Sequence, residues 1–413
     1  MLFSPTCNHN LNLQRGLQLM VNRKLLVASW AFLLPATITV LFIAGCKHST
    51  GTSGPNLQQP TLTDASYVGN DACKPCHESE FTSHHLSRHD TTMHPALCSV
   101  LGNLTPPSGV VPLGGFSVLR DGDSLIAQRD AGGSDGKLSR NLDLVLGSGK
   151  LGMTYVTLIN NDSLMETRMS YFPVYKIWDV TPGQEQRAPS DTPFGRVQPN
   201  IPARLCLGCH ATVISKSGLA VQKNMYGVGC ETCHGPGKAH ITAMQSGNSA
   251  EMHIDRLSSL SPTKLNELCG RCHRNARDVD LDTVEADQTH RFQPYALLRS
   301  QCRTKSKEPL SCVYCHNPHT DVSKSSEKYN KTCLACHSPN VRAVHVEQVP
   351  VEQQVQGKQC PVNQRTGCVG CHMRPRIAFP QTSVTATMAD HLIGPDKAHH
   401  ANASRPHGTE ADQ

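Results

Sequence analysis

The sequence repeats a short arrangement of two thiols and one imidazole, C-x-x-C-H, seven times along its 413 residues. In this motif both cysteines add to the vinyl groups of a haem, and the adjacent histidine binds the iron from one face. We therefore expect seven covalently attached haem c groups with their iron. The motif residues are Cys73, Cys76 and His77; Cys206, Cys209 and His210; Cys230, Cys233 and His234; Cys269, Cys272 and His273; Cys312, Cys315 and His316; Cys333, Cys336 and His337; and Cys368, Cys371 and His372.

Cysteine pairs at this spacing also occur in zinc ribbons and in thioredoxin-like redox sites. Zinc needs four ligands, usually from two such pairs, and gives no reason for a histidine directly after the second cysteine. A histidine arises there by chance about once in twenty times. All seven motifs have it. The pattern therefore favours haem over zinc or disulfides.

The second axial ligand decides what each haem can do, because a six-coordinate haem transfers electrons whereas an open face binds small molecules. His240 follows Gly235-Pro236-Gly237, and His319 follows Asn317-Pro318. These sharp turns after a motif histidine make it difficult for either side chain to reach the opposite face of its own haem. We therefore expect each to serve a neighbouring haem. His290 and His345 are weaker candidates, for which a surface role is equally consistent.

A short helix is predicted from Phe81 to Met93, which would place His85 and His89 one turn apart on the same face. Both are candidates for an axial position, and so is His94. Met93 could also bind an iron and would raise its potential, although methionine more often only packs.

The secondary structure that must position these residues is predicted to change along the chain, from strands before residue 200 to short helices after it. Phe116–Arg120 and Ser124–Ala127 flank Asp-Gly and predict a tight hairpin. Leu142–Leu146 is an apolar strand, and Met153–Ile159 with Leu164–Tyr171 predicts a second hairpin. Beyond residue 200 the close spacing of the motifs leaves room only for short helices, the clearest starting at residue 262. The predicted fold is a multihaem cytochrome c, with short helices and loops around packed haems and a small antiparallel β insertion.

The first residues read as an export signal. Met20 is followed by Arg23, Lys24 and an apolar run to Ile43, and translation is expected to start at Met20. The next residues, Ala44-Gly45-Cys46, resemble the lipobox of bacterial lipoproteins, so Cys46 is the expected lipidation site. An uncleaved membrane anchor is the alternative. The predicted organisation is a signal region (1–45), a lipidated tether (46–66), a first haem segment (67–104), the β insertion (105–200), a six-haem region (201–395) and a flexible tail (396–413).

Export also agrees with the cysteines and the charge. Cys98, Cys302 and Cys360 lie outside the motifs and could form one disulfide in an oxidising compartment. Only 38% of the residues are apolar, so covalent haem is expected to supply much of the buried apolar surface and to be required for folding. The formal charge of +6 includes three basic residues of the signal region, and haem propionates make the holoprotein acidic. A nucleic-acid partner is therefore not expected.

Three motif-containing segments, CETCHGPGKAH, SCVYCHNPH and TGCVGCHMRPR, together with MADHLI, resemble a family of multihaem c-type cytochromes from environmental bacteria such as planctomycetes and acidobacteria. This family is similar to the tetrahaem cytochrome of the hydroxylamine-oxidising pathway. LVLGSGKLGMTYV and RFQPYALLRSQC are similar to its β insertion and to the segment before its fifth motif. The resemblance covers residues 67–395 and implies closely packed, mostly bis-histidine haems. It also implies His391 as a distal ligand and favours His89 over His85 and His94.

The expected function is electron transfer by an exported, membrane-tethered protein, with redox proteins or a quinol-oxidising membrane complex as partners. The alternative is a multihaem reductase or oxidoreductase of small nitrogen or sulfur compounds at a haem with an open axial site. Pentahaem nitrite reductases carry lysine instead of the motif histidine at the catalytic haem, and every motif here ends in histidine. This favours electron transfer and assigns no catalytic residue. The first haem, separated from the others by the β insertion, is the candidate for an open face.

Overall fold

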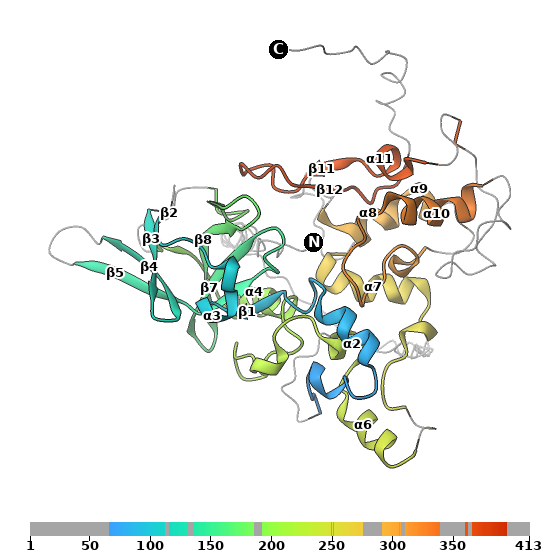
Figure 1. The fold of residues 1–413 in the computed structure, drawn as a ribbon, viewed down its shortest axis with the longest axis horizontal. Helices are drawn as coiled ribbons and strands as arrows, with labels where there is room; N and C mark the ends of the chain where they lie inside the picture. The colour runs from blue at the N-terminus through green and yellow to red at the C-terminus, as the bar shows by residue number, and fades with distance from the viewer. Residues whose placement is uncertain are drawn as a thin grey trace, which may run out of the picture. The chain divides into compact units, whose positions relative to one another are not determined.

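The structure is a computed structural model, shown as a ribbon in Figure 1. It describes residues 66–111, 115–130, 136–185, 192–248, 250, 252–275, 291–304, 306, 310–338, 360–361 and 366–394, which belong to one compact unit of the chain. The predicted signal, Cys46 and the tail lie outside the described residues, as do His290 and His345. None of the described helices combines the length and hydropathy needed to cross a membrane.

The described helices are short, and each haem motif lies within, at the end of or directly after one. The α-helices are α2 (Glu78–His85), α3 (Cys98–Leu101), α4 (Asn200–Gly208), α5 (Cys230–His234), α6 (Lys238–Gln245), α7 (Pro262–His273), α8 (Gln293–Arg299), α9 (Gln301–Thr304), α10 (Ser326–His337) and α11 (Cys368–His372). The 3-10 helices are η1 (Asn70–Ala72), η2 (Gly102–Leu104), η4 (Lys223–Met225), η5 (Leu257–Ser259) and η7 (Cys312–Tyr314).

Most of the described strands lie between residues 93 and 198 and pair antiparallel. One sheet has the order β1-β6-β7-β8-β10, with β9 also paired to β8, and a second has the order β2-β3-β4-β5. A small sheet pairs β11 with β12. The bounds are β1 (Met93–Pro95), β2 (Gly109–Val111), β3 (Phe116–Asp121), β4 (Ser124–Asp130), β5 (Lys137–Leu142), β6 (Leu144–Leu146), β7 (Met153–Asn160), β8 (Ser163–Phe172), β9 (Ile177–Val180), β10 (Gly195–Gln198), β11 (Pro375–Ile377) and β12 (Thr387–Ala389).

Local sequence signals located several of these elements. The two predicted hairpins are present as β3–β4 and β7–β8, and Asp121 pairs with Ser124 across the first turn. Helix α7 begins at Pro262, as predicted, and the side chain of Ser261 caps it by accepting from the Lys264 amide. The apolar run at 142–146 is divided between two strands, because β5 ends at Leu142 and β6 begins at Leu144.

The predicted helix from Phe81 to Met93 is wrong. Helix α2 covers only Glu78–His85, and Met93 lies in strand β1, where it pairs with Leu146. Beyond His85 the backbone bonds to distant parts of the fold instead of continuing the helix. The His89 carbonyl, for example, accepts from the Val228 amide. His85 and His89 are therefore not on one helix face.

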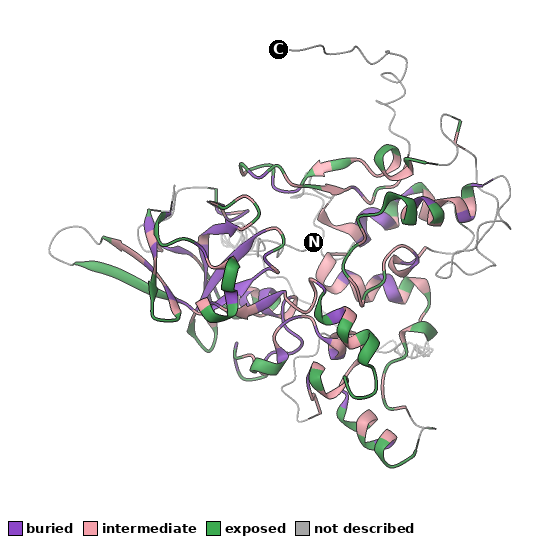
Figure 2. Ribbon diagram, viewed as in Figure 1, coloured by how far each residue is buried: buried purple, intermediate pink, exposed green. Residues whose placement is uncertain are grey.

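The buried apolar residues are concentrated in the sheets. One cluster joins Phe116, Val118 and Leu125 of the four-stranded sheet to Tyr155 and Met169 of the larger sheet. A second packs helix α4 against β6, β7 and β8. Figure 2 shows this contrast, with purple ribbon in the sheets and mostly intermediate or exposed residues in the helices. The described helices thus bury little apolar side-chain surface against one another, as expected where porphyrins complete the interior.

Candidate haem-binding sites

Helical turns form most of the motifs, and this explains how three side chains can bind one haem. The amide of His77 donates to the carbonyl of Cys73 (3.0 Å), and the amide of His316 donates to that of Cys312 (3.0 Å). In a helical turn, residues three and four positions apart lie on one face. The second cysteine and the histidine therefore follow the first cysteine on the same side.

The structure places four motif histidines opposite histidines from distant parts of the chain, with interplanar angles that range from 8° to 88°. The ring centroids are 6.0–6.4 Å apart, and each pair joins one motif histidine to one histidine outside the motifs. The pairs are His77 with His240 (6.4 Å), His234 with His319 (6.1 Å), His273 with His89 (6.2 Å) and His316 with His391 (6.0 Å).

This spacing fits two imidazoles bound to opposite faces of one iron. A metal–imidazole bond is about 2 Å long and the ring centre lies roughly 1 Å beyond the nitrogen, so two trans imidazoles have centroids about 6 Å apart. Among the described residues, no three His, Cys, Asp or Glu side chains converge as a group that could hold a metal ion. The donors occur as imidazole pairs, which is the protein's share of a haem iron whose other four ligands are porphyrin nitrogens.

Hydrogen bonds on Nδ1 orient several of these rings. His240 donates from Nδ1 to the Met252 carbonyl (2.7 Å), and His234 does so to the Asp255 carbonyl (3.0 Å). The Nδ1 atoms of His391 and His89 donate to the carbonyls of Ala389 (3.0 Å) and Pro318 (3.4 Å). Because a carbonyl only accepts, Nδ1 carries the proton and Nε2 keeps the lone pair that a metal requires.

Burial lowers the pKa of five of the paired imidazoles and so favours their neutral form, which is the state that binds metal. It lowers the pKa of His273 to about 3 and that of His316 to about 4. The pKa values of His89, His319 and His391 are also lowered, in each case mainly by burial.

The motif histidine of the second site, His210, has a different environment. It is only 2% exposed, and its Nδ1 donates to the Thr92 carbonyl (2.9 Å) beside strand β1. The same carbonyl accepts from the Gly147 amide (2.7 Å), so the sheet fixes the ring. Among the described residues, no other histidine ring faces His210 as in the four pairs. His94 does not present Nε2, because that nitrogen contacts the Gly147 carbonyl (3.2 Å).

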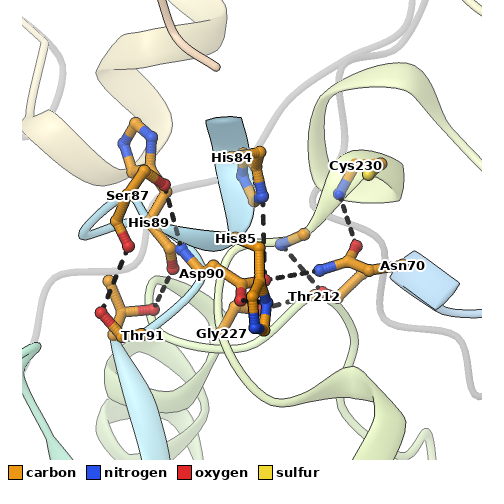
Figure 3. Close-up of polar contacts among 12 residues, drawn as sticks. Asn70, His84, His85, Ser87, His89, Asp90, Thr91, Thr212, Gly227 and Cys230 are labelled. Carbon is orange, nitrogen blue, oxygen red and sulfur yellow. Dashed lines mark hydrogen bonds and ion pairs between the residues drawn. The ribbon is translucent and has the colours of Figure 1, made fainter. Parts of the chain in front are cut away.

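His85 is part of a polar cluster around Asp90. Its side chain is 66% exposed, and Nδ1 contacts the Asp90 carboxylate at 2.8 Å. The buried His84 lies 3.7 Å from the other carboxylate oxygen, which also accepts from the Asn70 side chain (2.7 Å). Figure 3 shows His84, His85 and Asn70 around Asp90, and Asn70 continuing to Cys230. His85 therefore serves the loop that carries His89 rather than pairing with a motif histidine.

A buried carboxylate ties together the two segments that supply His77 and His240. Glu231, within the third motif, is 1% exposed. Its oxygens accept from the amides of Val68 (3.0 Å), Gly69 (2.8 Å) and Gly237 (2.7 Å). The first two amides precede the first motif, and the third precedes helix α6, which carries His240. No sequence signal identified Glu231, because nothing in its local pattern reveals partners about 160 positions away.

Thiols from different motifs also meet. The Cys73 thiol is hydrogen-bonded to Cys230, which lowers the pKa of Cys73. Further thiol–thiol hydrogen bonds pair Cys209 with Cys272, Cys269 with Cys312 and Cys333 with Cys368. The attachment points of different haems are thus neighbours.

Two features of the cysteines differ from the predictions. Cys98, Cys302 and Cys360 form no disulfide, so the pairing suggested among them is not present. Cys206 is disulfide-bonded in this structure, and its predicted thioether requires the reduced thiol instead.

The predicted distal ligands differ in what their side chains contact in the structure. His89, His240, His319 and His391 each face a motif histidine, as described above. His85 and His94 have other partners. Met93 is buried in the β core. His290 and His345 lie outside the described residues.

Parts of the sequence are similar to known cytochromes. Residues 184–235 match the family described as cytochrome c554 and c-prime. The multihaem cytochrome MtrA of Shewanella baltica (strain OS185) is 27% identical over 162 residues, which are 31% of this chain. The chain spans about half the length of this curated relative, 48%. The solved structure of the outer cell wall cytochrome OcwA is similar with a TM-score of 0.46, 16% identity and 79% coverage of each chain.

The seven C-x-x-C-H motifs, the match to a c-type cytochrome family and the similarity to a multihaem relative point in the same direction. Together they support a multihaem c-type cytochrome.

Proposed function

We propose that this protein is an exported heptahaem cytochrome that transfers electrons between redox partners through bis-histidine haems. The observation that carries the proposal is the set of four histidine pairs with ring centroids 6.0–6.4 Å apart. Haem iron supplies the redox chemistry by changing between the ferric and ferrous states. The chain's own residues hold two imidazoles on each iron, exclude water from the rings and set the distances between haems.

Two imidazoles on one iron favour electron transfer over catalysis, because they occupy both axial positions where a substrate could bind. The first haem was the sequence-based candidate for an open face, yet His240 faces His77. A reductase acting on small nitrogen or sulfur compounds remains the alternative function. It would need a haem without a second protein ligand.

The membrane tether rests on Cys46 and the lipobox-like residues before it. A lipid on Cys46 would hold the haem region at a membrane surface, near a quinol-oxidising complex or other redox proteins. One lipid chain gives weak and reversible binding on its own, so stable attachment requires more than one acyl chain.

The test uses the purified, mature holoprotein. Mass spectrometry should give the mass of the polypeptide plus seven haems. Ferric protein should show low-spin electron paramagnetic resonance signals, and reduced protein should bind little carbon monoxide relative to its haem content. A bare polypeptide mass would refute the haem assignment. A full haem content with stoichiometric carbon monoxide binding at most haems would refute bis-histidine ligation and favour the reductase.

A further inference from the structure

Three asparagines make the same contact between different haem motifs. Each lies three residues before the first cysteine of its own motif, and its Oδ1 accepts from the backbone amide of the first cysteine of another motif. The contacts are Asn70 with Cys230 (2.9 Å), Asn266 with Cys312 (3.0 Å) and Asn330 with Cys368 (3.1 Å). They link the first motif to the third, the fourth to the fifth and the sixth to the seventh.

The spacing of three explains why one asparagine can act together with its own cysteine. Residues i and i+3 lie on the same helix face, so the asparagine and the cysteine can both contact the first cysteine of the other motif. The thiols of each linked pair of motifs also meet, as Cys73 with Cys230, Cys269 with Cys312 and Cys333 with Cys368. Each link therefore consists of an amide contact and a sulfur contact side by side.

The amide that donates to the asparagine has the same position in all three cases. Helices α5, η7 and α11 each begin at the first cysteine of their motif. The amide of the first helical residue has no partner within its own helix, so an outside acceptor satisfies it. Asn266 is 3% exposed and Asn330 is 7% exposed, and the cysteine amides that they bind are partly buried, so loss of the acceptor would leave a partly buried donor unpaired.

Two of the helices that carry an accepting asparagine are built alike. Helices α7 and α10 each have 12 residues and end at the motif histidine. Each is capped by a serine, Ser261 or Ser325, which accepts from the amide three residues later. The asparagine occupies the fifth position of both helices.

Three of the histidine pairs connect one linked pair of motifs to another. His89 follows the first motif and faces His273 of the fourth. In return, His319 follows the fifth motif and faces His234 of the third. His391 follows the seventh motif and faces His316 of the fifth. The middle pair is thus joined to both of the others.

We propose that Asn70, Asn266 and Asn330 are positioning residues that fix six haem-binding motifs as three equivalent di-haem units. The units are arranged in the order first/third, fourth/fifth and sixth/seventh. The second motif stands outside the series. It has Ala203 at the asparagine position and meets the middle unit, because Cys209 contacts Cys272. This rests on the proposed electron transfer, for which the units would provide three successive steps.

The test replaces Asn330 with leucine in the holoprotein and measures circular dichroism in the Soret band. Porphyrins held in close contact couple their transitions and give a signal of two opposite lobes. Leucine has the higher helix propensity, so α10 itself is not weakened. If the three units contribute independently, Asn330→Leu should remove about a third of the two-lobed signal with haem content and low-spin fraction unchanged.

Two variants separate the amide contact from other effects. Asn330→Asp keeps an oxygen that can accept from the Cys368 amide and should retain the signal. Lys331→Leu places the same apolar side chain one residue later, where the lysine is 64% exposed, and should match the unchanged protein. Asn70→Leu tests the first unit by the same Soret measurement, and it serves as the test of the proposal if the Asn330→Leu protein does not accumulate.

Wild-type Soret signals in Asn330→Leu and Asn70→Leu, with full haem content, would overturn the proposed units while leaving electron transfer intact. A protein without covalent haem would instead refute the proposed function. Equal losses in Asn330→Leu and Lys331→Leu would also overturn the role of the asparagine.

Discussion

Replacing His240 with alanine should convert one haem, and only one, to the five-coordinate state. His240 faces His77 with a centroid distance of 6.4 Å, and no other described histidine lies opposite His77 in the same way. The side chain is half-buried and its Nδ1 makes one hydrogen bond, to the Met252 carbonyl. Losing that hydrogen bond costs about 1 kcal/mol, too little to prevent folding or haem attachment.

The expected magnitude follows from the ligand count. If each of the seven motifs carries a haem, as proposed, one lost imidazole makes about one-seventh of the haem high-spin. Carbon monoxide binds ferrous haem that has an open face, so a titration of the reduced variant should take up one more equivalent per protein than the unchanged protein. Ferric samples should show a matching high-spin resonance.

His253→Ala is the matched control, because His253 is an exposed histidine outside the motifs. It should leave the carbon monoxide stoichiometry unchanged. The same stoichiometry in His240→Ala as in the control would refute the pairing of His77 with His240. A gain of several equivalents would show that the change disrupts more than one site.

Other changes test the remaining assignments. His94→Ala should create no high-spin haem, since its Nε2 contacts the Gly147 carbonyl; one extra equivalent of bound carbon monoxide would make His94 an axial ligand. Glu231→Gln should lower stability by about 1–3 kcal/mol, because a buried carboxylate that accepts from three backbone amides in two segments becomes a weaker acceptor. Thermal denaturation measures this against Glu327→Gln, whose side chain is 77% exposed, and equal melting temperatures would count against it. Cys46→Ala should release the protein from membranes with its haem content intact, and persistent membrane association in fractionation would contradict lipidation.

Local signals in the sequence were sufficient for the haem motifs, the β3–β4 and β7–β8 hairpins and the start of α7. Each depends on residues within a few positions, such as Ser261 capping α7 through the Lys264 amide. The prediction at Phe81–Met93 failed because its helical pattern competed with distant contacts. The His89 carbonyl accepts from Val228, and Met93 joins the sheet. Tertiary contacts there outweigh a weak local preference.

The sequence by itself determined the haem chemistry, because C-x-x-C-H is a covalent requirement met within five consecutive residues. Only the tertiary structure decided which imidazoles lie opposite one another and which motifs are neighbours. His77 and His240, or His89 and His273, lie far apart in the chain, and a local pattern does not encode such pairings. The asparagine three residues before a first cysteine is a partial exception, since its repetition at Asn266 and Asn330 is visible in the sequence. Its partner amide is not, because that contact forms only when two distant helical turns pack together.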